Sequence, residues 1–335
     1  WCFEPMAASS CPYGLRQAEG GPCGVVAPVQ AFLLRQLLLS STSPETAGAD
    51  QCRAALFEAL TDILFQCAAP LGDGSGVVRL LALPSNSKTD RTTTVRHLLR
   101  HKPEGCIVHE FSEREVLRSA WEQDDALRAS YFVDPDGAGE SAGVLLFLYS
   151  ALATRGVGRV RADADIPTDV AMVGAHAYCS QEAANLLLTG IASSNVFDGE
   201  RCVGGNEKEQ GLRLCGVSTR PEVGFLTLFE AFGSLEVGSL LKRPHWPVWV
   251  VHAESHYSVL FGRQAEAEED VETDVWYYDP LGRQDEEKRI TVRPQRLSAP
   301  PEEDDLDSNG MIAKVIRTRW GVLADLDWNG AEPVY

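Results

Sequence analysis

The stretch PVWVVHAESHYSVLF, residues 247–261, decides the fold class expected for this chain. Its two halves, Pro247–Val251 and Ser255–Phe261, are rich in β-branched and aromatic residues, and a short polar segment separates them. Both features are typical of neighbouring strands joined by a tight turn. Two later runs repeat the pattern, Val275–Tyr278 and Arg289–Arg293. Together these runs predict an antiparallel sheet, which makes residues 245–300 sheet-rich.

The residues before this sheet, 20–232, form a region that we expect to be helix-rich. The segment VVAPVQAFLLRQLLL, residues 25–39, is apolar on almost every side, which predicts a helix buried over most of its surface. The other expected elements are helices at Gln51–Ala68, Arg114–Tyr131 and Ser141–Thr154 and strands at Val77–Leu83 and Cys106–Phe111. We therefore expect a single α+β domain over residues 1–335, with the helical region packed on the antiparallel sheet.

The chain is strongly acidic, and much of its negative charge is concentrated in one segment. The 335 residues include 48 acidic and 30 basic side chains, a formal net charge of −18. Such a field opposes binding to nucleic acid and to anionic membrane surfaces, so neither is an expected partner. Residues 264–307 hold 15 acidic and 5 basic side chains, which places −10 of the charge there. We expect the acidic parts, residues 264–274 and 300–308, to be solvated loops.

Nine cysteines are scattered along the chain without paired spacing. An odd, dispersed set favours free thiols in a reducing compartment, so we expect an intracellular location, in the cytoplasm or the nucleus. The longest apolar stretch, residues 142–153, is shorter than the roughly 20 residues that a membrane-spanning helix needs. It is therefore expected to be a buried core helix.

Cys23 differs from the other cysteines in its setting. The sequence GGPCG, residues 20–24, places it where a glycine-rich loop enters the buried helix. Unpaired N–H groups and the helix dipole stabilise a thiolate at such a position. The flanking glycines also let other backbone approach the sulfur closely. Cys23 is therefore the candidate nucleophile, and the alternative is a small apolar residue in the turn before the helix.

A cysteine nucleophile requires a base, usually an imidazole. His256 begins the second expected strand of the sheet and Asp279 follows the third, and these positions are adjacent at one edge of an antiparallel sheet. A carboxylate there would orient the ring and stabilise the imidazolium. On spacing alone, His252 and His245 remain alternatives to His256. Asp279 has an alternative use as the start of an ordinary turn, because Pro280 follows it.

Gln17 lies six residues before Cys23 on the same loop. A side-chain amide at such a position can point at the negative charge that develops during attack on a carbonyl, so Gln17 is the candidate oxyanion-hole donor. The alternative is a solvated loop glutamine.

A zinc site is the competing use of cysteine and histidine. Cys106 with His109, and His176 with Cys179, have spacings that would supply four ligands. Neither pair has a glycine-rich knuckle or the paired-cysteine spacing usual for structural zinc. We therefore expect neither a metal nor an organic cofactor.

Several motifs resemble one family along most of the chain. YGLRQAEGGPCGVVAPVQ, residues 13–30, is similar to the catalytic cysteine motif of the MINDY deubiquitinases, in the branch of the third and fourth members. The matching order continues to the C-terminus and resembles the fourth-member branch throughout. The further motifs are LLLTGIASSNVFDG at 186–199, VGFLTLFEAFGSLEVGSLLKRPHWPVWVVHAESHYSVLFG at 223–262, VWYYDPLG at 275–282, IRTRW at 316–320 and DWNGAEPVY at 327–335.

The resemblance implies a function and assigns roles. It implies a catalytic domain of variant papain-like cysteine protease fold that cleaves isopeptide bonds in polyubiquitin, preferring chains linked through lysine 48 of ubiquitin. Cys23 would be the nucleophile, His256 the general base and Gln17 the oxyanion-hole amide, with Asp279 as the third residue. The expected partners are ubiquitin and polyubiquitin chains. Two alternatives remain: a ubiquitin-binding protein with weak or no catalysis, and a general papain-like peptidase.

Overall fold

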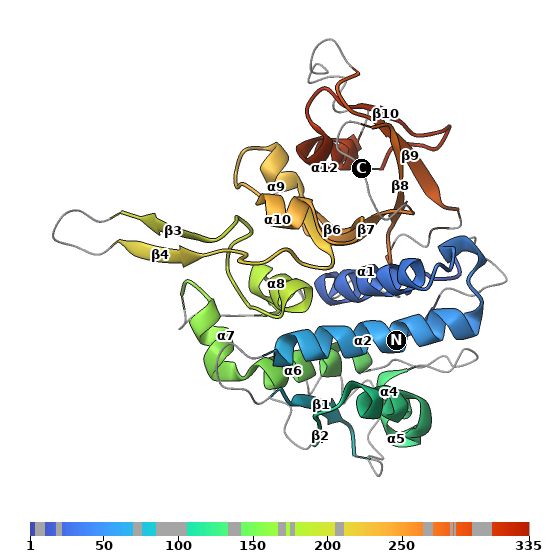
Figure 1. Ribbon diagram of the computed structural model, residues 1–335, viewed down its shortest axis with the longest axis vertical. Helices are drawn as coiled ribbons and strands as arrows, with labels where there is room; N and C mark the ends of the chain where they lie inside the picture. Colours follow the sequence, from blue (N-terminus) through green and yellow to red (C-terminus); the bar gives the residue numbers. More distant parts are fainter. Residues whose placement is uncertain are drawn as a thin grey trace.

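The computed structural model describes residues 1–3, 11–17, 22–69, 76–84, 106–132, 142–166, 172–174, 178–204, 211–263, 271–281, 284, 286–296 and 310–334. Helices and strands form layers, with helix α1 (Cys23–Leu39) in the middle (Figure 1). The chain is thus an α+β protein, as expected from its sequence.

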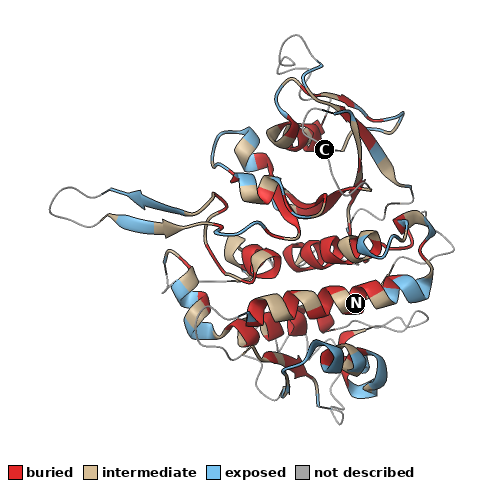
Figure 2. Cartoon of the chain, viewed as in Figure 1, coloured by how far each residue is buried: buried red, intermediate tan, exposed pale blue. Residues whose placement is uncertain are grey.

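Helix α1 is surrounded by other elements. It contacts α2 (Ala49–Ala68) on one side and strands β6 (Val248–Ala253) and β7 (His256–Gly262) on the other. Contact on both sides explains why the helix is apolar nearly all round, and Figure 2 shows it buried along most of its length. The other helices are η1 (Pro44–Thr46), α4 (Arg114–Gln123), α5 (Asp125–Tyr131), α6 (Gly143–Arg155), α7 (Val157–Asp163), α8 (Gln181–Thr189), α9 (Leu228–Ala231), α10 (Ser239–Lys242) and α12 (Gly310–Trp320).

The main sheet has six strands in the order β10-β9-β8-β7-β6-β5. Its remaining strands are β5 (Gly224–Thr227), β8 (Thr273–Tyr278), β9 (Lys288–Arg293) and β10 (Asp325–Asp327). Neighbouring strands are antiparallel except for β5, which pairs with β6 in parallel. The expected antiparallel sheet is therefore present, and the parallel edge strand comes from the region that we expected to be helical.

Two small hairpins accompany the main sheet. β1 (Val78–Ala82) pairs with β2 (Ile107–Phe111), close to the strand positions expected from the sequence. β3 (Glu200–Val203) pairs with β4 (Leu212–Cys215) and extends away from the rest of the molecule (Figure 1). This second hairpin was not predicted from the sequence, because its strands are only four residues long and largely exposed.

The central strands β6 and β7 of the main sheet are buried on both faces. Val250 belongs to the core that includes α1, whereas its neighbour Val251 belongs to a second core that includes α12. Adjacent side chains of a strand point to opposite faces, so a strand covered on both faces is apolar without interruption. The continuous apolar runs of β6 and β7 have this cause.

The single helix expected over Arg114–Tyr131 is wrong, because the structure has two helices that meet at Asp124. The Asp124 side chain accepts hydrogen bonds from the N–H groups of Ala126 at 2.9 Å and Leu127 at 3.0 Å. Such an N-cap satisfies the free donors of a new helix start, so α5 begins there in a new direction.

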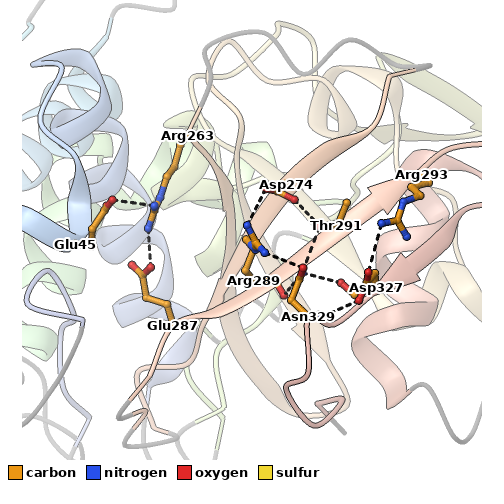
Figure 3. A network of polar contacts seen from close by, with 9 residues as sticks. All are labelled: Glu45, Arg263, Asp274, Glu287, Arg289, Thr291, Arg293, Asp327 and Asn329. Atoms are coloured by element: carbon orange, nitrogen blue, oxygen red, sulfur yellow. Dashed lines mark hydrogen bonds and ion pairs between the residues drawn. The ribbon is translucent and has the colours of Figure 1, made fainter.

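The expected acidic loop at residues 264–274 is too long, because Thr273 and Asp274 belong to β8. Asp274 accepts a hydrogen bond from the Thr291 hydroxyl at 2.6 Å and pairs with Arg289 at 3.5 Å (Figure 3). Asn329, in the DWNG turn, contacts the same two residues and so ties the C-terminal turn to β9. Residues 264–270, and all of the acidic segment at 300–308, lie outside the described residues.

Candidate active site

Cys23 is the first residue of α1 and lies against the turn between β6 and β7. It is 4% exposed, and its Sγ is 4.0 Å from the carbonyl oxygen of Ser255. Glu254 and Ser255 form the turn, and Ala253 pairs with His256 across it. The hairpin therefore brings His256 to the first turn of the helix that carries Cys23.

His256 contacts both Cys23 and Asp279. Its Nε2 is 2.7 Å from Oδ1 of Asp279, and its ring interacts electrostatically with the Cys23 side chain. The same carboxylate oxygen accepts a hydrogen bond from the N–H of Leu281 at 2.9 Å, which orients the carboxylate. Because Asp279 engages Nε2, Nδ1 is the nitrogen left to face the thiol.

The pKa of His256 lies well above that of an ordinary imidazole. Burial lowers this pKa, but the hydrogen bonds and negative charges of Asp279 and Cys23 outweigh burial and raise it from 6.5 to about 10. The ring is therefore protonated at neutral pH. A protonated imidazole stabilises a neighbouring thiolate and can donate a proton to a leaving group.

The other two candidate bases occupy different positions. The ring of His252 stacks on Tyr257 with centroids 4.3 Å apart. Burial, together with the charge of His256, lowers the pKa of His252 to about 4, so its ring is neutral at physiological pH. His245 is exposed and precedes β6, at the end of that strand opposite the turn. Of these three histidines, the structure brings His256 to Cys23.

Gln17 lies at the same edge of the sheet as Asp279. Its backbone N–H donates a hydrogen bond to the carbonyl of Pro280 at 2.8 Å, so the loop before Cys23 is attached to the turn that carries Asp279. Gln17 is 8% exposed, which does not fit the alternative of a solvated loop glutamine.

Gln284 is a residue at this site that the sequence analysis missed. Its Oε1 accepts a hydrogen bond from the N–H of Asp279 at 3.0 Å, and its Nε2 donates to the carbonyls of Tyr277 at 2.9 Å and Glu286 at 3.0 Å. These bonds hold the turn at the end of β8 in shape and thereby place the Asp279 carboxylate. An amide five residues after Asp279, in a turn-rich segment, is the signal that would have found it.

Gly24 and Cys179 pack closely beside the nucleophile candidate. A Cβ placed on Gly24 would lie 2.5 Å from Cβ of Cys179 and 3.2 Å from Cε2 of Tyr257, so this position has no room for a side chain. Burial, reinforced by the charge of Cys23, raises the pKa of Cys179 to about 12. Cys179 is therefore a protonated thiol at neutral pH and a poor nucleophile.

The zinc alternative finds no support among the described residues, where no group of three or more histidine, cysteine or acidic side chains is placed to hold a metal ion. His109 lies within β2, whereas Cys179 packs against Gly24. His176 lies outside the described residues. All nine cysteines belong to the described part of the chain, and each is a free thiol.

The helices that the structure describes include none with both the length and the apolar character to cross a membrane.

Comparison with known proteins identifies the family. Residues 3–330 match the family described as deubiquitinating enzyme MINDY-3/4, conserved domain. The protein named Probable ubiquitin carboxyl-terminal hydrolase MINDY-4 of Bos taurus is 36% identical over 97% of this chain and 41% of its own length. Its Homo sapiens counterpart is 34% identical over 99% of this chain and 42% of its own length.

The resemblance extends to the third member of the family. Ubiquitin carboxyl-terminal hydrolase MINDY-3 of Homo sapiens is 34% identical over 74% of this chain and 57% of its own length. This chain therefore spans less than half of the MINDY-4 relatives and somewhat more than half of MINDY-3. No solved structure matches the chain. Because the family match covers nearly all of its residues, the chain belongs to the MINDY-3/4 family and is similar to MINDY-4 along almost its whole length.

Proposed function

We propose that this chain is the catalytic domain of a cysteine-dependent deubiquitinase. The observation that carries the proposal is the set of contacts at His256, which meets Cys23 on one side and the Asp279 carboxylate, at 2.7 Å, on the other. This is the arrangement that a thiol hydrolase requires, and the family names support the same activity. The proposed fold class is a variant papain-like one, in which the nucleophile opens a helix and the other two residues lie at the edge of a sheet.

The proposed reaction begins from the thiolate of Cys23 and the imidazolium of His256. The thiolate attacks the carbonyl carbon of the C-terminal glycine of ubiquitin, and the Gln17 amide donates to the oxygen that becomes negative. His256 gives its proton to the lysine amine, the C–N bond breaks and a thioester forms. Water then loses a proton to His256 and attacks the thioester, which releases the ubiquitin carboxylate and restores the thiolate.

Ubiquitin and polyubiquitin chains are the proposed partners, with a preference for linkage through lysine 48 of ubiquitin. The names of the relatives support ubiquitin as the substrate. The acidity of the chain, −18 overall, supports a partner with basic features and argues against nucleic acid.

A panel of di-ubiquitins, one for each linkage type, tests the proposal. We expect the wild-type chain to cleave the lysine 48 linkage fastest, and the Cys23→Ala variant to cleave none. Cys52→Ala is the matched control, because Cys52 is a buried cysteine in α2 that we place outside the site. Faster cleavage of unrelated peptides would favour a general papain-like peptidase and contradict the proposal.

A ubiquitin-binding protein with weak catalysis is the second candidate. The burial of Cys23 favours this candidate. Cys23 is only 4% exposed, and a substrate must reach its sulfur before it can be cleaved. Di-ubiquitin that binds to the wild-type chain but stays intact under all conditions tested would establish this candidate and exclude the first.

A further inference from the structure

Gln30 is a polar side chain in the middle of the apolar helix α1. It is 0% exposed. Its Oε1 accepts a hydrogen bond from the N–H of Leu15 at 2.6 Å, and its Nε2 donates to the carbonyl of Tyr13 at 3.1 Å. A buried amide without partners is costly, by about 1–3 kcal/mol, so this residue is compatible with the core only because the loop supplies both partners.

The loop that Gln30 contacts is the one that ends at Gln17. The Tyr278 hydroxyl donates to the carbonyl of Leu15 at 3.2 Å, so both backbone groups of Leu15 are bound to side chains. Two residues later, Gln17 is attached to Pro280 through its own backbone N–H. Between them, the N–H of Arg16 donates to the carbonyl of Cys2 at 2.8 Å. The path of this loop is therefore set by side chains of α1 and β8, by the turn after β8 and by the N-terminal residues.

Gln30 and Cys23 belong to the same helix and are seven residues apart. Seven residues are about two turns of helix, so the two side chains have a fixed relation through rigid backbone. Gln30 thus connects the helix that carries the proposed nucleophile to the loop that carries the proposed oxyanion donor. An apolar side chain at this position would fill the same space but would remove the two hydrogen bonds from the loop to α1, leaving the loop attached to β8, to the turn after β8 and to Cys2.

We infer that Gln30 is a positioning residue, which holds the Gln17 amide at the distance from Cys23 that oxyanion stabilisation requires. The inference rests on the proposed function. A positioning role differs from a purely structural role because the effect of Gln30 on the reaction depends on the Gln17 amide. A structural role would instead lower the amount of folded protein and would affect every property of the site equally.

The test is a double-mutant cycle between Gln30→Met and Gln17→Ala. Methionine has a similar length and no amide, so it keeps the packing of α1 and removes both hydrogen bonds. The rate measured is hydrolysis of a fluorogenic amide of the ubiquitin C-terminal glycine, as kcat and KM separately. A displacement of about 1 Å in a catalytic group can lower the rate about 100-fold, and we expect Gln30→Met to lower kcat by about this factor with little change in KM.

The expected result of the cycle is strong non-additivity. In the Gln17→Ala background, Gln30→Met should change kcat by less than about 3-fold, because the donor that it positions is already absent. Alkylation of Cys23 by iodoacetamide, which needs no oxyanion donor, should be unchanged by Gln30→Met. Equal effects of Gln30→Met in both backgrounds, or an equal loss of alkylation, would overturn the inference.

Two controls keep the test decisive. Asn185→Leu removes another fully buried amide, whose donated hydrogen bonds go to residues 193–195, and its effect should be additive with Gln17→Ala. If Gln30→Met does not fold, Tyr278→Phe releases the Leu15 carbonyl by loss of one hydroxyl, and additivity of that variant with Gln17→Ala would count against the inference. A wild-type chain without hydrolysis would refute the proposed function instead, so the two failures are distinguishable.

Discussion

Replacement of Asp279 by alanine should lower the pKa of His256 by a measurable amount. The pKa is raised from 6.5 to about 10 although burial acts in the opposite direction, so the two negative partners of the ring provide the entire increase. An opposite charge at such a distance shifts a pKa by about 1–3 units, and the Asp279 oxygen is 2.7 Å from Nε2. We therefore expect a His256 pKa of about 7–9 in Asp279→Ala. Asp279→Asn keeps a hydrogen-bond acceptor and loses only the charge, so its shift should be smaller.

The assay is an NMR titration of the folded chain with labelled histidine side chains. The His256 resonance is assigned by its absence in His256→Gln, and no substrate is needed. Asp124→Asn is the matched control, because Asp124 also accepts backbone hydrogen bonds but caps α5. A His256 pKa that stays within about half a unit of wild type in Asp279→Ala would refute the role given to this carboxylate.

The same shift has a consequence for stability. Because the native state binds the His256 proton more tightly than the unfolded chain does, the ring contributes stability that is fully present below pH 6.5 and is lost as the pH rises through about 10. Urea denaturation across this range should show a smaller decline in Asp279→Ala. An equal decline in both chains would mean that groups other than His256 cause it.

Three further changes test single elements of the site. Gly24→Ala places a Cβ 2.5 Å from Cβ of Cys179, so we expect this variant to lose hydrolysis. Adding Cys179→Gly should restore part of the activity. Full activity of Gly24→Ala would mean that the close packing is unimportant. His252→Phe keeps an aromatic ring over Tyr257 and should retain hydrolysis, whereas inactivity of folded protein would reopen the choice of base. Glu254 has φ +56° at the turn, a conformation that costs a non-glycine residue roughly 1–2 kcal/mol. Glu254→Gly should therefore raise the free energy of unfolding by up to about 1 kcal/mol, after the entropy of glycine in the unfolded chain is subtracted, and a decrease in urea denaturation would contradict this.

The parts of the fold that follow from local pattern were predictable from the sequence. The apolar runs of β6, β7 and β8 and the buried character of α1 need no knowledge of the rest of the chain. The proximity of His256 to Asp279 also follows from strand order alone, since the start of one antiparallel strand is beside the end of the next. Periodicity and strand order thus locate one edge of the sheet as the place where a histidine and a carboxylate meet.

Features that depend on distant partners were not predictable in the same way. Gln30 resembles an isolated polar residue in an apolar helix until Tyr13 and Leu15 are seen to pair with it. Strand spacing did not separate His252 from His256, because the two differ in their contacts. His252 is buried against Tyr257, whereas His256 contacts Asp279. The exposed β3–β4 hairpin has too few buried side chains to produce a clear periodic pattern of apolar residues in the sequence.

The most direct test of Cys23 as the nucleophile is the reaction of the chain with ubiquitin that bears an electrophile at its C-terminus. We predict a covalent adduct at Cys23 in the wild-type chain, located by mass spectrometry of its peptides. The adduct should be absent in Cys23→Ala and formed much more slowly in His256→Gln, because the thiolate loses its imidazolium partner. An adduct on any other cysteine, or binding of this ubiquitin without any adduct in the wild-type chain, would contradict the assignment of Cys23 and His256 as the catalytic pair.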